Sequence, residues 1–137
     1  MAFALHPQLA ADSHDVGNTQ HCMIRLVRDS RFLWLLAVPR YADCREWHAL
    51  PTDVAMQVFK DVSALAAWAE AYSNADKMNI AALGNQVPQL HIHVVARHIG
   101  DAAWPNPIWG SGPMQPYAEQ KSAEIITRLQ AALALTS

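Results

Sequence analysis

Val-Pro-Gln-Leu-His-Ile-His-Val-Val-Ala, residues 87–96, is the stretch that most strongly predicts how this chain folds. Its polar residues Gln89, His91 and His93 alternate with aliphatic ones, which is the period of two that defines a β-strand. Packing the aliphatic face on a core leaves an amide and two imidazoles on the other face, with neighbouring groups roughly 7 Å apart. Such a row of proton-accepting side chains predicts a functional site, although a His-x-His pair is also compatible with an ordinary surface or with half of a metal site.

Polar residues flank this stretch on both sides. Gly-Asn-Gln-Val-Pro, residues 84–88, is a turn-prone segment whose backbone amides could face a ligand. Arg97 and His98 follow the stretch and bring positive charge to its other end. By strand alternation His98 points away from the face of His91, which favours a surface position for it.

The rest of the sequence predicts an α+β fold. Strand-like runs cover residues 22–27, 32–38 and 77–83, and the continuously apolar run at 32–38 predicts a central strand buried on both faces. Apolar residues spaced three and four apart predict a helix from Thr52 or Asp53 to about Tyr72, and another over about 116–135. Together these elements predict an antiparallel β-sheet meander with one long helix between strands and a C-terminal helix.

The chain length of 137 residues predicts a single domain that covers residues 1–137. Residues 1–20 place turn-forming residues between isolated apolar ones, which predicts an extended or loop-like arm ahead of a core at 22–97. Residues 101–116 are rich in proline, so we expect an irregular loop before the C-terminal helix.

Composition and charge exclude several classes of protein. The net charge is −2 and the ten Lys and Arg residues are scattered, so there is no basic stripe to bind a nucleic-acid polymer. The longest apolar run is far shorter than the roughly 20 residues that span a bilayer, and the N-terminus lacks a basic start, so we expect a cytoplasmic protein without a membrane partner. Cys22 and Cys44 are expected as reduced thiols, and the absence of a Cys-x-x-Cys pair disfavours a thiolate zinc site.

A Gly-x-x-Val-x-Gln-x-His-x-His pattern that begins at Gly84 closely resembles the motif of the histidine triad (HIT) superfamily of nucleotide hydrolases and transferases. The resemblance extends from about residue 22 to residue 97 and includes the Ala-Val-Pro-Arg run at 37–40. Trp104 and Trp109 resemble the segment that, in relatives, approaches the site or the partner subunit. An ordinary packing role for the two tryptophans is an alternative.

The family pattern is His-x-His-x-His, and its positions fall here on Gln89, His91 and His93. The resemblance implies that His91, at the middle position, attacks an α-phosphorus and forms a covalent nucleotidyl-histidine that water then cleaves. A free imidazole is suited to this role because its reference pKa of about 6.5 leaves most of it neutral near pH 7. The resemblance also implies that His93 contacts the phosphoryl oxygens and that Gln89, in place of the first histidine, adds a neutral donor. This scheme requires no cofactor and no metal ion.

The resemblance further implies small nucleotide substrates, such as dinucleoside polyphosphates or nucleoside phosphoramidates, and a homodimer. Gln86 lies where many relatives place a Ser or Thr that assists the leaving group, and an amide transfers a proton less readily than a hydroxyl. Asn79 and Asn85 are candidates for ribose or phosphate contacts, with a strand-end hydrogen bond as the ordinary role of Asn79. In the first hairpin, where many relatives bind ribose with Asn or Asp, this chain has Arg28-Asp29.

Two other interpretations of these residues stay open. The replacement of reactive residues by Gln89 and Gln86 is compatible with a nucleotide-binding module that has weak or no turnover. The His-x-His pair together with His98 could instead ligate a metal, since a similar pattern occurs in cupin-like metal sites. Arg97 beside such a site disfavours the metal interpretation, because its charge repels a cation.

Overall fold

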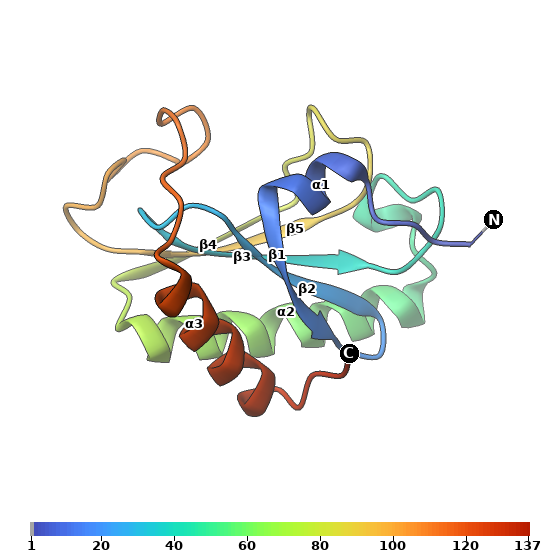
Figure 1. Cartoon of the computed structure of the whole chain (residues 1–137). Coiled ribbons are helices and arrows are strands. Elements are labelled where there is room, and N and C mark those ends of the chain that lie inside the picture. Colours follow the sequence, from blue (N-terminus) through green and yellow to red (C-terminus); the bar gives the residue numbers. More distant parts are fainter. Residues whose placement is uncertain (1) are drawn as a thin grey trace.

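The apolar runs fold into one five-stranded antiparallel sheet in the computed structural model, which describes residues 2–137 (Figure 1). The strands are β1 (Ser13–Asn18), β2 (Cys22–Val27), β3 (Leu33–Pro39), β4 (Lys77–Ala81) and β5 (Ile92–Arg97). The helices are α1 (Pro7–Asp12), α2 (Thr52–Ser73) and α3 (Glu119–Ala132), with a short 3-10 helix η1 (Trp47–Ala49). The expected α+β class with an antiparallel sheet is confirmed. The sheet order is β1-β2-β3-β5-β4, so β5 inserts between β3 and β4 and the order departs from a simple meander.

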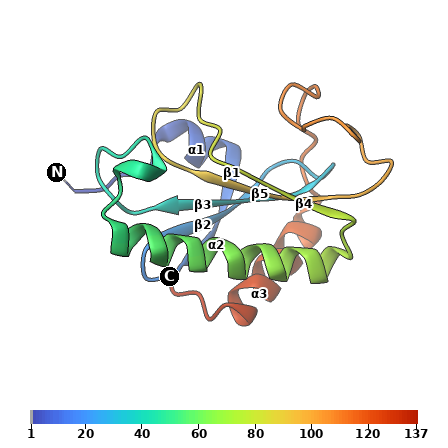
Figure 2. The ribbon, with the colours of Figure 1, turned by 180° about the vertical axis from the view of Figure 1, so that it is seen from behind.

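The sheet lies between a layer of two long helices and a layer that consists mostly of loops. Helices α2 and α3 cover one face, whereas α1 and the two long loops around residues 82–91 and 98–116 lie over the other (Figures 1 and 2). The main apolar core lies between the sheet and the two long helices. A smaller cluster, which includes Leu9, Leu36 and Val87, lies under α1.

Side-chain alternation in β3 and β5 decides which groups reach each face of the sheet. Leu35, Ile92 and Val94 belong to the core between the sheet and α2. For Ile92 and Val94 this is the position that the alternation of the histidine stretch predicted. Trp34 and His93 point to the opposite face, where their side chains contact each other. In the register of the sheet His93 stands opposite Leu36 of β3. The alternation therefore delivers the polar half of the stretch to the face that carries the loops.

The long helix α2 lies where its periodicity predicted it. Its buried residues include Val58, Val62 and Leu65, which are spaced four and three apart along one stripe. Asn74 adopts the left-handed conformation with a φ of 51° and ends the helix by donating its backbone N–H to the carbonyl of Glu70.

The N-terminal region is more regular than the sequence predicted. The segment expected as an extended or loop-like arm contains α1 and the edge strand β1 (Met1 itself lies outside the described residues). Pro7 occupies the first helical position and the His6 side chain accepts the backbone N–H of Gln8, which satisfies a helix terminus that the composition did not reveal.

The histidine strand begins later than expected, at Ile92 instead of residue 87. Pro88 has no N–H to donate to a strand ladder, and the N–H of Leu90 donates to the carbonyl of Cys44 outside the sheet. The C-terminal helix is also shorter than the expected 116–135. As expected from its prolines, 101–116 contains no helix or strand. Within residues 2–137, no helix has both the length and the apolar character needed to cross a bilayer.

Candidate functional site

A cavity of about 390 Å³ opens on the loop-covered face of the sheet, bounded by α1, the β2–β3 hairpin and the segments 83–87 and 108–114. Its walls are largely apolar and include Leu9, Val27 and Leu36. Polar and charged side chains complete the lining: Asp12, Arg31, Asn85, Gln86, His91 and His93. The fold thus brings both histidines of the motif, and residues as far apart in the sequence as Leu9 and Met114, into one concave site of the kind that binds small molecules.

His91 precedes β5 and is 5% exposed. Its Nδ1 lies 2.6 Å from the backbone carbonyl oxygen of Gln89. Because a carbonyl oxygen only accepts, the neutral ring carries its single proton on Nδ1 and keeps its lone pair on Nε2. Gly84 packs against the same ring, so closely that a Cβ at this glycine would lie 3.1 Å from the ring carbon Cε1. The main chain therefore orients the imidazole and leaves Nε2 available for reaction.

His93 is held by the protein through both ring nitrogens. The indole Nε1 of Trp34 donates to Nδ1 of His93 at 3.0 Å, and Nε2 of His93 donates to the carbonyl oxygen of Leu83 at 2.8 Å. Burial, opposed by the Leu83 hydrogen bond and assisted by the nearby His91, lowers the pKa of His93 to about 4. His93 was expected to contact phosphoryl oxygens, but both of its ring nitrogens are already hydrogen bonded to Trp34 and Leu83.

Trp109 closes the cavity over the histidines. Its ring meets the His93 ring edge to face, with centroids 5.1 Å apart and planes at 80°. The buried indole N–H of Trp109 has no hydrogen-bond partner within residues 2–137. Trp104 lies elsewhere, with the guanidinium of Arg97 5.6 Å from its ring centroid. Of the two tryptophans in this segment, the structure therefore places Trp109 at the site and Trp104 in packing.

Gln89 points its amide away from the cavity lining and binds the N-terminal segment. Its Oε1 accepts the backbone N–H of His6 at 2.8 Å, and its Nε2 donates to the carbonyl of Ala4 at 2.8 Å. The side chain expected to act as a phosphate donor is thus engaged at both ends. Its backbone carbonyl, in contrast, accepts the N–H of His91 Nδ1 and holds that ring.

Asn79 lies outside the cavity, in a buried polar cluster at the far end of β5. Its Oδ1 accepts from Arg97 at 2.8 Å, which matches the ordinary structural role considered for this residue. Arg97 is 2% exposed and forms a two-pronged ion pair with Asp101, whose pKa is lowered mainly by that hydrogen bond. The positive charge expected near the histidines is therefore neutralised within this cluster.

Asn85 and Gln86, the two other residues expected to bind substrate, are exposed and line the cavity. His98, the third ligand of the metal interpretation, hydrogen bonds instead to the carbonyl of Ser73 at 2.8 Å. Across residues 2–137, no group of three or more His, Cys, Asp or Glu side chains is placed to hold a metal ion. The structure therefore does not assemble the site that the metal interpretation requires.

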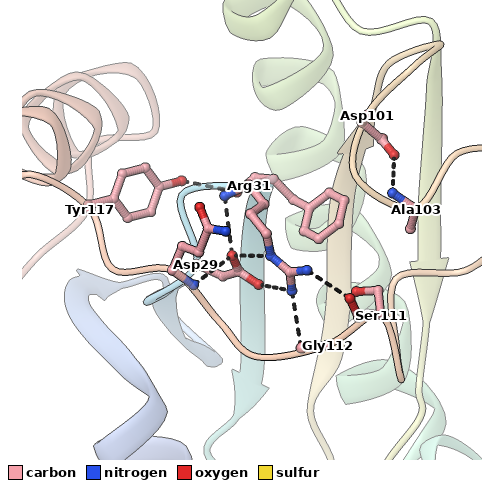
Figure 3. Close-up of polar contacts among 9 residues, drawn as sticks. Asp29, Arg31, Asp101, Ala103, Ser111, Gly112 and Tyr117 are labelled. Atoms are coloured by element: carbon pink, nitrogen blue, oxygen red, sulfur yellow. Dashed lines mark hydrogen bonds and ion pairs between the residues drawn. The ribbon is translucent and has the colours of Figure 1, made fainter.

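Asp29, in the hairpin to which the resemblance assigned ribose binding, is fully buried. Figure 3 shows the guanidinium of Arg31 between this carboxylate and the loop carbonyls of Ser111 and Gly112. Burial by itself would raise the pKa of Asp29, but the hydrogen bonds from Arg31 and from the backbone of Gln115 outweigh burial and lower that pKa. The carboxylate is thus saturated by protein groups, and the Asp29–Arg31 pair ties the loop to the hairpin.

Three residues of the site were not predicted from the sequence. Trp34 looked like part of a buried apolar strand, Arg31 like part of a solvated turn, and Asp12 like part of a loop. Asp12 is the acidic side chain among the cavity-lining residues, and its Oδ2 accepts from Gln8 at 2.9 Å. For Trp34 the sequence did contain a usable signal. Its indole N–H stands in an otherwise aliphatic run, and a buried indole N–H needs a hydrogen-bond partner.

Comparisons with known proteins agree with the motif. A family model described as HIT domain matches residues 8–100. The structure superimposes on a histidine triad protein of Marinobacter aquaeolei with a TM-score of 0.95 and 41% identity, covering 98% of each chain. A histidine triad protein of Bradyrhizobium japonicum gives a TM-score of 0.95 at 35% identity, over 97% of this chain and 99% of that one. A histidine triad protein of Sinorhizobium meliloti gives 0.93 at 37%, over 96% and 97%. No curated protein matches significantly.

Proposed function

Because this chain belongs to the HIT domain family, whose members are generally nucleotide-binding hydrolases or transferases, we propose that it hydrolyses or transfers small nucleotides through a covalent nucleotidyl-histidine at His91. The observation that carries the proposal is the state of the His91 ring. Its Nδ1 is bound to the Gln89 carbonyl, and its Nε2 is left with a lone pair in a cavity large enough for a nucleotide fragment. A ring oriented in this way is a preorganised nucleophile.

The proposed reaction proceeds in two displacements at one phosphorus. In the first, Nε2 of His91 forms a bond to the α-phosphorus while the bond from phosphorus to the leaving-group oxygen or nitrogen breaks. In the second, water attacks the same phosphorus and gives up one proton to solvent, while the P–N bond to histidine breaks and its electron pair returns to Nε2 of the imidazole. The proton stays on Nδ1 and remains hydrogen bonded to the Gln89 carbonyl throughout, which stabilises the positive charge on the ring in the intermediate.

The cavity supplies groups suited to a nucleotide. Apolar walls such as Leu9 and Val27 offer a surface to a base, while Asn85 and Gln86 offer amide donors to phosphate oxygens. The indole N–H of Trp109, which has no hydrogen-bond partner among residues 2–137, is a further donor at the same site. Because Gln86 is a poor proton donor, we expect phosphate leaving groups, which need no protonation, to react faster than amines.

Mass spectrometry of the intact protein after exposure to diadenosine triphosphate and to adenosine 5′-phosphoramidate tests the proposal. An added nucleotidyl mass that maps to His91 supports it, and His91→Ala should lose both the adduct and turnover while staying folded. His48→Ala, which alters an exposed histidine of η1, is the matched control and should behave like the unaltered protein. Turnover that survives in His91→Ala would rule the mechanism out.

A nucleotide-binding module without turnover is the second candidate, and it is favoured by the two amides that replace reactive residues. Gln89 is occupied by the N-terminal segment, so it gives the reaction only its backbone carbonyl. Calorimetric binding of the same two nucleotides without an adduct on His91 would select this candidate.

We also propose that the chain forms a homodimer and acts in the cytoplasm, where Cys22 and Cys44 stay free, buried thiols. β4 is an edge strand, and its Ile80 is 49% exposed, which leaves an apolar strand edge for pairing with a second copy. Light scattering coupled to size-exclusion chromatography should give twice the chain mass, and a monomer mass would contradict this proposal.

A further inference from the structure

His93 connects two elements that no local pattern links. Its Nδ1 accepts the indole N–H of Trp34, and its Nε2 donates to the Leu83 carbonyl. An indole N–H can only donate and a carbonyl oxygen can only accept, so these two partners allow one tautomer, with the single proton on Nε2. Protonation of Nδ1 would direct one N–H at another and leave the indole donor without an acceptor.

This arrangement leaves His93 no ring nitrogen for a substrate oxygen. Burial lowers the pKa of His93 to about 4, so the ring stays neutral near pH 7. The titratable group that packs on it is His91, and Asp12 and Arg31 line the same cavity. The third motif histidine therefore differs in role from a phosphate ligand.

The ring of His93 supports His91 in two ways. The two imidazoles pack edge to face, with centroids 4.9 Å apart and planes at 67°. The carbonyl that His93 binds belongs to Leu83, the residue before Gly84, and Gly84 lies against the His91 ring. A shift of His93 would therefore move both the packing surface and the backbone that orient His91.

We propose that Trp34 and His93 form a positioning pair for His91, in which His93 is a single-tautomer bridge from the Trp34 indole to the Leu83 carbonyl. The inference rests on the proposed function in that His91 is the reacting group. Its chemical consequence is specific, because the glutamine amide also accepts at one end and donates at the other. His93→Gln should preserve the bridge, whereas His93→Leu should remove both hydrogen bonds while it fills the space.

Nitrogen-15 NMR of the histidine rings tests the bridge without any substrate. In the unaltered protein His93 should appear as the Nε2–H tautomer and stay neutral down to about pH 5. Trp34→Phe removes the indole donor, so the titration of His93 should move toward that of a free histidine. An Nδ1–H tautomer, or a titration near 6.5 in the unaltered protein, would overturn the bridge.

Turnover of diadenosine triphosphate tests the positioning role. His93→Leu and Trp34→Phe should lower kcat about tenfold to a hundredfold through misplacement of the nucleophile, while His93→Gln should stay within about tenfold. Trp68→Phe, the same change on α2 where Trp68 stacks on Tyr72, is the matched control and should leave kcat unchanged. A fully active His93→Leu variant would overturn the positioning role.

The two tests separate this inference from the proposed function. If the unaltered protein forms no adduct and turns over no nucleotide, the proposed function fails and the NMR experiment alone decides the bridge. If the adduct forms on His91 but His93→Gln behaves like His93→Leu, the proposed function stands and the bridge is overturned.

Discussion

Replacement of His93 by glutamine should remove much of the sensitivity of this protein to mild acid. In the folded state burial lowers the pKa of His93 to about 4, against 6.5 for an unperturbed histidine. As the pH falls through this window, the unfolded chain takes up a proton that the folded chain does not bind. The stabilisation is therefore present above pH 6.5 and is lost as the pH falls toward 4. Glutamine keeps both hydrogen bonds but has no proton to gain.

The two pKa values set the size of the effect. Each pKa unit corresponds to about 1.4 kcal/mol, so the full separation limits the loss to about 3 kcal/mol. Between pH 7 and pH 4.5 the linkage relation gives a loss of about 2 kcal/mol in the free energy of unfolding. Asp29 and Asp101, whose pKa values are also lowered, contribute only below the unperturbed value of 3.8 and so lie outside this window.

Urea denaturation at pH 7 and pH 4.5 measures the difference. The unaltered protein should lose about 2 kcal/mol more than His93→Gln over this interval. His14→Gln is the control, because His14 is half-buried at the surface and its removal should leave most of the acid loss in place. Equal losses in the unaltered protein and in His93→Gln would refute the argument that His93 is buried as a neutral ring.

Three further predictions concern the cavity. Gly84→Ala would place a Cβ 3.0 Å from a backbone carbonyl and 3.1 Å from the His91 ring, so kcat should fall about a hundredfold while circular dichroism stays unchanged; normal activity would show that the loop can yield. Arg31→Lys replaces a planar fork by a single ammonium, so limited proteolysis should cut the 101–116 loop faster, and an unchanged cleavage rate would contradict the proposed tie. Protein groups already occupy the hydrogen-bonding capacity of Asp29, so Asp12 is the cavity carboxylate left to accept hydrogen bonds from ribose hydroxyls. The unaltered protein should therefore prefer ribonucleotides over 2′-deoxyribonucleotides roughly tenfold in kcat/KM, and Asp12→Asn should abolish this preference. The exposed Asp15→Asn should retain that preference, and a retained preference in both variants would exclude this role for Asp12.

Much of the fold followed from local patterns. The alternation in the histidine stretch predicted which side chains reach the core, and the spacing of apolar residues predicted α2 within a residue or two. The N-terminal region was harder to predict, because a six-residue helix and an edge strand each bury few residues and leave a weak periodic signal. The late start of β5 depends on Leu90, whose N–H finds its partner at Cys44.

The sequence by itself determined that His91 and His93 reach the same side of the chain beside a turn-prone segment, and its motif resembled that of the family to which the chain belongs. Only the tertiary structure decided what each polar side chain does. Trp34 reaches His93 across 59 positions, and His6 reaches Gln89 across 83, so no local pattern could reveal these hydrogen bonds. A buried donor or acceptor pairs with whichever polar group the fold brings within about 3 Å. In this fold such partners occupy both ring nitrogens of His93, whereas at His91 they occupy Nδ1 and leave Nε2 free.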